Sequence, residues 1–322
     1  MASCNCGANH HPAPQPDFSR KMQAITAVIN PQSLQESKTG NMLLFQSLPN
    51  HTLGLEQFEH KENANASAQG QSGRVMGCYD AVPVVPTLAL ESNLVSMVHD
   101  NLVHVFGVLH QTNSICRLSP VVEPLPNSHV PNGIIAGCSN GDSNGWIYYQ
   151  KKVGRKLMIV ERSLENINAE PVPVNKTEDA LENTQLVAFW DGSHRWIVYQ
   201  TEDSKGKPST IKAKCVDRAD GDDIEQSHKF AGGRSKQMAA VHTKAAGNQI
   251  YIYFTSSDNE VFRSVANLSG GALQFPQPEA LATNLTIAEY ASLAVAPHLK
   301  HNVIYTVPEA NDRITVIKDP LA

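Results

Sequence analysis

Six short apolar segments of this chain can be aligned with one another. At one aligned position, called the shared position, the residue type varies between the segments. The residues at this position, in chain order, are Ile29, His99, Ser139, Trp190, His242 and Pro297. Two of them are histidines, whose pKa near working pH suits them to general acid or base chemistry. His99 and His242 are therefore the predicted catalytic residues.

Three more aromatic residues, Trp146, Trp196 and Tyr251, begin the segments that follow and lie near the shared position in register. Tryptophan and tyrosine rings offer broad apolar surfaces on which a ligand can stack. Together with Trp190 and Ser139, they are predicted to form one substrate-binding pocket, because ligand sites are concave and mostly apolar. The alternative is that the same side chains fill the protein core.

Other catalytic and metal-binding motifs lack the context that their chemistry needs. The segment Gly137–Gly141 matches G-x-S-x-G, but it leads into another strand instead of a helix. The acidic run 217–225 lacks the alternating oxygen ligands of an EF-hand loop and is expected to be a solvated loop. The histidines and cysteines of the first eleven residues lie in a Gly- and Pro-rich leader. We therefore predict no metal and no cofactor.

The elements that position these residues form a three-strand pattern that occurs six times. The first strand is built from small and aliphatic residues, in the segments 22–30, 92–100, 132–140, 183–191, 235–243 and 290–298. The second strand is more aromatic, as in GWIYYQ (145–150) and RWIVYQ (195–200), and a third, alternating strand follows a polar hairpin. Alternation with a β-branched and aromatic bias is typical of strands.

The spacing of the later units, about 50 to 55 residues, is close to the size of one four-stranded propeller blade. Antiparallel units that each expose an apolar face bury it best by closing into a ring. The sequence thus predicts an all-β fold, a six-bladed β-propeller with antiparallel four-stranded blades around a central channel. An open array of β-sandwiches is the alternative. In the propeller, the first strand of each blade would line the channel.

The predicted domain organisation is a disordered leader over residues 1–21 and a single propeller domain over 22–322. The leader also offers a closing strand around 17–21, because the chain ends soon after the third strand of the sixth unit. An insertion loop is expected at 60–85 in the first blade. A Pro-rich connector is expected at 119–131, between the second and third units.

Composition excludes several classes of partner. The formal net charge is −5 with scattered Lys and Arg, which argues against nucleic acid as a partner. No apolar run is long enough for a membrane span. Sequons with the pattern N-x-S/T begin at Asn50, Asn65, Asn175, Asn267 and Asn284. We expect a secretory-pathway or extracellular protein whose signal peptide has already been removed, with N-glycosylation at these positions.

The words YYQ and VYQ, each followed by a polar hairpin and a third strand, resemble the blades of fungal fucose-binding lectins, which are six-bladed propellers. The resemblance extends over residues 22–319. In those lectins an Arg two residues before the paired aromatics grips the sugar, with a Glu on the next strand and a neighbouring Trp. Here the Arg positions read Trp146, Trp196, Tyr251 and Asn302, and the matching Glu is missing in the fifth unit. The resemblance implies a kept scaffold whose sugar sites are lost.

That combination is similar to a second group on this scaffold, the secreted fungal hetero-Diels–Alderases of tropolonic sesquiterpene biosynthesis. The resemblance implies a cofactor-free pericyclase that joins an o-quinone methide, from a tropolone or polyketide precursor, to a humulene-type sesquiterpene. His99 or His242 would then help water leave, and the aromatic residues would hold two small apolar substrates.

The alternative function is a carbohydrate-binding lectin with divergent specificity, and a third is a structural or protein-interaction propeller. A lectin is expected to repeat its binding residues in several blades, whereas an enzyme holds one site. Because the shared position varies between the units, with only histidine occurring twice, one site is favoured. The sequence leaves a homodimer open.

Overall fold

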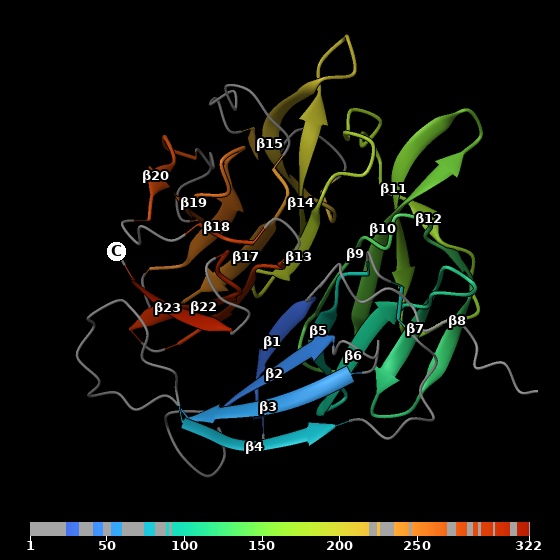
Figure 1. The fold of residues 1–322 in the computed structure, drawn as a ribbon. Helices are drawn as coiled ribbons and strands as arrows, with labels where there is room; N and C mark the ends of the chain where they lie inside the picture. Colours follow the sequence, from blue (N-terminus) through green and yellow to red (C-terminus); the bar gives the residue numbers. More distant parts are fainter. Residues whose placement is uncertain are drawn as a thin grey trace, which may run out of the picture.

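The computed structural model describes residues 24–31, 41–47, 53–59, 74–80, 88–89, 92–218, 224–225, 235–244, 247–268, 275–281, 286–288, 291–298, 300–309 and 314–321. These residues form antiparallel sheets, each made of strands that follow one another along the chain. Figure 1 shows the sheets arranged around a common centre. We call the sheets blades one to six, in chain order.

The first three blades have four described strands each. Blade one contains β1 (Ile25–Ile29), β2 (Met42–Ser47), β3 (Leu53–Glu59) and β4 (Arg74–Asp80). Blade two contains β5 (Val95–His99), β6 (Leu102–Val108), β7 (Ser114–Ser119) and β8 (Glu123–His129). Blade three contains β9 (Ile135–Ser139), β10 (Gly145–Val153), β11 (Lys156–Ser163) and β12 (Val172–Pro173).

Blade six has one described strand fewer than the others. Blade four contains β13 (Leu186–Trp190), β14 (Arg195–Glu202), β15 (Pro208–Cys215) and β16 (Ile224–Glu225). Blade five contains β17 (Met238–Thr243), β18 (Gln249–Thr255), β19 (Val261–Asn267) and β20 (Glu279–Ala280). Blade six contains β21 (Ala294–Pro297), β22 (His301–Thr306) and β23 (Thr315–Pro320). The closing strand predicted around 17–21 lies outside the described residues.

The first strand of each blade is the innermost one. In order, β1, β5, β9, β13, β17 and β21 each contact the first strand of the next blade, and β21 contacts β1 (Figure 1). Hydrophobic clusters fill the spaces between neighbouring blades. The predicted all-β propeller of antiparallel sheets is confirmed, and so is the inner position of the first strands. No helix in the described residues has the length and apolarity to span a membrane.

The outermost strands of two blades lie in segments that were predicted to be a connector and an insertion loop. The segment 119–131, predicted as a connector, contains β8 with Pro124 and Pro126. Proline is tolerated there because an outermost strand has a free edge that needs no N–H donor. β8 is anchored by Ser128, whose hydroxyl accepts a hydrogen bond of 3.0 Å from the Ile115 amide. β4 similarly falls within 60–85, the segment assigned to an insertion loop, whose remaining residues are outside the described ranges.

The glutamines of the YYQ and VYQ words link adjacent blades. Gln150 donates to the Leu181 carbonyl at 3.0 Å and accepts from the Asn183 amide at 2.8 Å. Gln200 accepts from the Ser235 amide at 3.0 Å. Both glutamines are buried, as are Leu181 and Ser235, so the bonds to these two residues satisfy backbone groups that water does not reach. The words on which the lectin resemblance depends therefore have a structural role in blade packing.

Loss of the Thr177 hydroxyl should destabilise the fold even though Thr177 belongs to a predicted glycosylation sequon. The buried hydroxyl donates to the Val174 carbonyl at 2.9 Å and accepts from the Ile159 amide at 3.1 Å. Thr177→Ala leaves both backbone groups unsatisfied, so we expect a loss of about 1–3 kcal/mol in the free energy of unfolding. Denaturant unfolding of protein made in bacteria measures this without any glycan.

The matched control is Asn175→Gln, which destroys the same sequon at an exposed side chain. It should leave the free energy of unfolding within about 0.5 kcal/mol of the original value. Equal losses in the two variants would contradict the role given to the Thr177 hydroxyl.

Candidate functional site

The shared position identified in the sequence lies at one end of the inner strands. It is the last residue of β1, β5, β9, β13 and β21, and the next-to-last residue of β17. Ser139 uses its hydroxyl to donate to the Val98 carbonyl of blade two and to accept from the Gly141 amide. The predicted site residues therefore share one end of the propeller, but they contact different neighbours.

His99 is packed between blades two and three. It is 6% exposed, and its ring meets His104 edge-on with 5.2 Å between ring centroids. The Nδ1 atom of His99 has no hydrogen-bond partner in the described residues. Burial, with a smaller effect of the His99 charge, lowers the pKa of His104. A Cβ on Gly145 would lie 2.7 Å from Leu164 Cδ1, so the glycine is needed for the packing of Leu164 beside His99, whose Nδ1 would be 3.4 Å from that Cβ.

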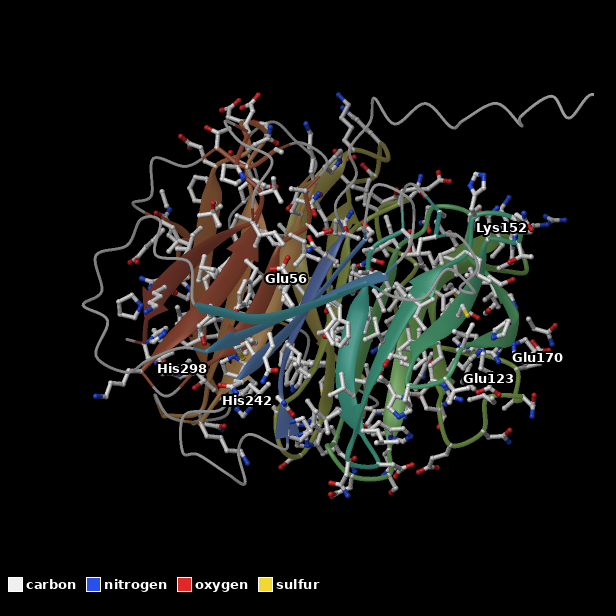
Figure 2. All side chains as sticks on the ribbon, turned by 60° about the horizontal axis from the view of Figure 1, so that its bottom comes forward. Glu56, Glu123, Lys152, Glu170, His242 and His298 are labelled. Atoms are coloured by element: carbon white, nitrogen blue, oxygen red, sulfur yellow. The ribbon has the colours of Figure 1, made fainter. Side chains whose placement is uncertain are left out.

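His242 belongs to blade five and is separate from His99. Its Nε2 lies 2.6 Å from Asn248 Oδ1, which only accepts, so Nε2 carries the proton. Burial lowers the pKa of His242, partly offset by this hydrogen bond. Figure 2 shows His242 on the other side of the molecule from Glu123 and Glu170 of blades two and three. The two predicted catalytic histidines are thus held in blades that are not neighbours.

Two of the predicted pocket aromatics lie in the core. Trp196 is 1% exposed, stacks on Phe189 with 6.3 Å between ring centroids, and donates through Nε1 to Asp191 at 2.7 Å. Tyr251 is 0% exposed and stacks on Tyr253. For these two rings the structure agrees with the core-filling alternative.

The other two predicted aromatics, Trp146 of blade three and Trp190 of blade four, lie together. Their rings stack with 6.0 Å between centroids and an interplanar angle of 18°, and both side chains are half-buried. The guanidinium carbon of Arg195 lies 4.7 Å from the centre of the Trp146 ring, in a cation–π contact. This interface therefore combines apolar ring surface with a positive charge.

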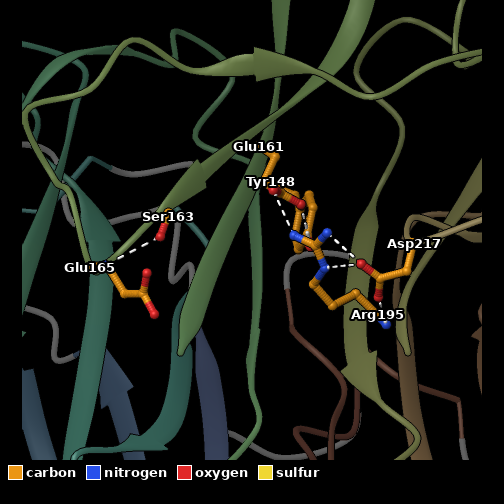
Figure 3. A network of polar contacts seen from close by, with 6 residues as sticks. All are labelled: Tyr148, Glu161, Ser163, Glu165, Arg195 and Asp217. Atoms are coloured by element: carbon orange, nitrogen blue, oxygen red, sulfur yellow. Dashed lines mark hydrogen bonds and ion pairs between the residues drawn. The ribbon is translucent and has the colours of Figure 1, made fainter. Parts of the chain in front are cut away.

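Arg195 is held by one carboxylate from each blade (Figure 3). Its Nη1 donates to Glu161 of β11 at 2.6 Å, and its Nε donates to Asp217, after β15, at 2.7 Å. The Tyr148 hydroxyl donates to the second Glu161 oxygen at 2.8 Å. The Arg195 and Glu161 side chains are 17% and 18% exposed, so solvent reaches the cluster. Burial alone would lower the pKa of Arg195, but the Asp217 hydrogen bonds and the Glu161 charge raise it above its ordinary value.

A tight hairpin places Trp190 and Arg195 side by side. The two residues pair directly across β13 and β14, so their side chains project from the same face. The Asp191 carboxylate accepts from the Ser193 and His194 amides at 2.7 Å each, and Gly192 takes a φ of 99° in the turn. That conformation suits glycine because it has no Cβ. We call Trp146, Trp190, Arg195, Glu161 and Asp217 the blade 3/4 cluster.

The two tryptophans of this cluster were predicted from the sequence as pocket residues, but its charged residues were not. The lectin-like Arg was sought at Trp196, one residue after Arg195 in the RWIVYQ word. Glu161 stands in the third strand of blade three, and the partner it binds comes from the next blade. The sequence does contain an Arg and a Glu in consecutive units. Only the packing of the blades shows that these two residues form an ion pair.

A separate cavity of about 140 Å³ lies in the central channel at the opposite end of the inner strands. None of the predicted site residues lines it. No group of three or more His, Cys, Asp or Glu side chains in the described ranges is arranged to hold a metal ion.

Comparison with known proteins supports the scaffold. No protein-family model matches the chain, and no curated protein matches it either. The solved structure of the fucose-specific lectin from Aleuria aurantia is 12% identical, with 93% of this chain and 96% of that chain covered and a TM-score of 0.58. AofleA from Arthrobotrys oligospora is 11% identical, with 90% and 81% covered and a TM-score of 0.59.

The SapL1 lectin, solved in complex with alpha methyl fucoside, is 12% identical, with 94% and 98% covered and a TM-score of 0.59. At such identities the likeness shows the fold alone. This chain has a lectin-like propeller scaffold, as the resemblance implied.

Proposed function

We propose that this propeller binds a carbohydrate at the blade 3/4 cluster. The observation that supports the proposal most is the contact of Arg195 with Trp146, beside Glu161. A sugar ring has an apolar face of C–H groups and an edge of hydroxyls. The stacked tryptophans suit the apolar face, and the Arg–carboxylate pairs suit the edge.

The charged groups keep hydrogen-bonding capacity beyond the bonds that hold them in place. Arg195 has five N–H donors, and its bonds to Glu161 and Asp217 leave one hydrogen on each terminal nitrogen. The carboxylate oxygens also keep free lone pairs. Because Arg195 is fixed from two sides, a ligand would bind without ordering that side chain first, which favours affinity.

The proposal specifies one site in each chain. At the position of Trp190, the other blades have Ile29, His99, Ser139, His242 and Pro297. None of these residues has an indole ring. A stacked pair of tryptophans therefore cannot form at the other blades. A stoichiometry of one ligand per chain therefore follows.

The hetero-Diels–Alderase hypothesis has less support. It needs several aromatic walls and a histidine around one cavity that holds two apolar partners. Trp196 and Tyr251 are packed in the core, and His99 and His242 lie in separate blades. The fold neighbours, which are named as lectins, favour carbohydrate binding.

The proposal includes a secreted, glycosylated protein. Of the sequons, Asn175 and Asn267 are exposed in the structure, so a glycan fits at each. Asn50, Asn65 and Asn284 lie outside the described residues. A mass loss on enzymatic removal of N-glycans, after expression in a eukaryotic secretory host, would support this part of the proposal, and an unchanged mass would contradict it.

Removal of either half-buried tryptophan should weaken carbohydrate binding about tenfold or more. A tenfold change corresponds to about 1.4 kcal/mol, which is within the range expected for losing one ring contact. We would titrate methyl α-fucoside and a glycan panel into the original protein, Trp146→Ala and Trp190→Ala by calorimetry. The original protein should saturate at one equivalent per chain.

Leu102→Ala is a matched control, because Leu102 is an exposed apolar side chain of blade two. It should bind like the original protein, and all variants should keep its circular dichroism spectrum. Absence of binding to every glycan, several equivalents per chain, or unchanged affinity in both tryptophan variants would each overturn the proposal.

A further inference from the structure

The channel cavity is a second candidate site, independent of the blade 3/4 cluster. It is lined by the first halves of the inner strands and by the residues just before them. The blade 3/4 cluster includes Trp190, the last residue of β13, and so lies at the other end of the same strands. A ligand in the cavity would therefore not contact the proposed carbohydrate site.

The described lining of the cavity is uncharged. No Asp, Glu, Lys, Arg or His is among the described residues that line it. Transfer of an ion from water into such a space, without an opposite charge to pair with it, is strongly unfavourable. The cavity therefore selects a neutral ligand.

Part of the polar lining is already occupied by bonds between blades. The Thr26 and Ser96 hydroxyls bind each other at 2.8 Å, between blades one and two. The Asn93 amide donates to the Ile135 carbonyl at 2.6 Å and accepts from the Ile135 amide at 2.9 Å, between blades two and three. These side chains hold the wall of the channel together.

The remaining polar side chains, those of Gln185, Gln237 and Ser292, make no hydrogen bond to the described residues. Gln185 and Gln237 directly precede β13 and β17, and Ser292 lies two residues before β21. All three are half-exposed and line the cavity. At the same register position, blade two has Leu94, which also lines the cavity, whereas the buried Ala24 and Ile134 of blades one and three are not among the described lining residues. Blades four to six thus give the cavity one polar arc with free hydrogen-bonding capacity.

We propose that this cavity binds a small neutral polyol of about six heavy atoms, such as glycerol. Two primary amides and a hydroxyl supply paired donors and acceptors, which match adjacent hydroxyl groups. The apolar lining residues of blades one to three, such as Ile25, Leu94 and Ile135, would receive the C–H face of the ligand. A cavity of about 150 Å³ holds a six-atom ring such as benzene, so 140 Å³ is suited to a ligand of this size. At the ligand efficiencies seen for small molecules, the Kd is about 1 mM.

Ligand-observed NMR titration with glycerol tests the proposal. Glycerol should give a saturable signal, while glycerate and 2-amino-1,3-propanediol, which are of similar size but charged, should bind at least about tenfold more weakly. Gln185→Leu and Gln237→Leu keep the side-chain volume but remove the amide, and each should weaken glycerol binding about fivefold or more. Leu102→Ala should leave it unchanged.

If one glutamine variant fails to fold, the other and Ser292→Ala test the same arc. A signal that does not saturate, equal binding of the charged analogues, or unchanged binding in the folded variants would overturn the proposal. Glycan binding is measured on the same samples, so this site and the blade 3/4 cluster can fail separately.

Discussion

Replacement of Trp196 by alanine should lower the free energy of unfolding by about 3–5 kcal/mol, the range measured for large aromatic core residues. The indole is 1% exposed and stacks on Phe189. Its Nε1–H also binds Asp191, a carboxylate that orders the hairpin between β13 and β14. The variant therefore loses buried apolar area and one hydrogen bond, and it leaves a cavity between blades four and five. Urea unfolding followed by circular dichroism measures the loss.

Trp190→Ala is the matched comparison, since Trp190 is a half-buried indole six residues earlier in the same blade. It should cost clearly less stability than Trp196→Ala but should weaken ligand binding. Trp196→Phe, which keeps most of the ring, should recover much of the loss. A Trp196→Ala protein within about 1 kcal/mol of the original would contradict the core position of Trp196 and restore it as a pocket residue.

The strand pattern could be predicted because its causes are local. Alternation and β-branched or aromatic residues mark first, second and third strands in all six units, and each predicted segment overlaps a strand of the structure. β8 was missed because its prolines suppress the strand pattern, and they are tolerated only at an edge. Whether a segment lies at an edge depends on the assembled sheet.

Exposure of the tryptophans could not be predicted, because it depends on a cross-strand neighbour. Trp146 and Trp196 occupy the same position in the words GWIYYQ and RWIVYQ. Trp146 pairs with Cys138, whereas Trp196 pairs with Phe189, whose ring covers it. A small partner leaves one indole half-exposed, and a large partner buries the other. Register pairing thus distinguishes a candidate site residue from a core residue.

The charged part of the blade 3/4 cluster could not be predicted either, because it also depends on neighbours in the folded protein. Inner-strand and second-strand residues alternate between the faces toward the preceding and the following blade. Arg195 projects toward blade three, where Glu161 lies, although the two residues are in different units of the sequence. Within its own repeat unit, neither Arg195 nor Glu161 has the other as a partner. The propeller therefore creates chemistry at its interfaces that no single repeat contains.

A second network links blade five to blade six and makes stability depend on pH. The Asp319 carboxylate, 3% exposed, accepts from Arg263 and from the Tyr253 hydroxyl, both at 2.6 Å. Tyr253 in turn accepts from Asn302 at 2.8 Å. Burial raises the pKa of Asp319, and the hydrogen bond from Tyr253 and the charge of Arg263 only partly offset this. The stability contribution of this group is therefore greatest below about pH 4, its ordinary pKa, and is lost as the pH rises through the folded-state pKa.

Arg263→Met should strengthen this dependence. Without the guanidinium, ionised Asp319 loses the only ion-pair partner that it has among the described residues, whereas the other partner of Arg263, Glu279, lies largely in solvent. We expect a loss of about 3–5 kcal/mol at pH 7 and a much smaller loss near pH 4, because the raised pKa of Asp319 favours the protonated, uncharged carboxyl in the folded protein as the pH falls. Urea unfolding between pH 4 and pH 8 measures both values. The double variant Arg263→Met/Asp319→Asn removes both charges, so it should recover most of the stability at pH 7 and flatten the profile. A loss in Arg263→Met that is the same at every pH would mean that the guanidinium stabilises the interface by packing and not by balancing the buried carboxylate.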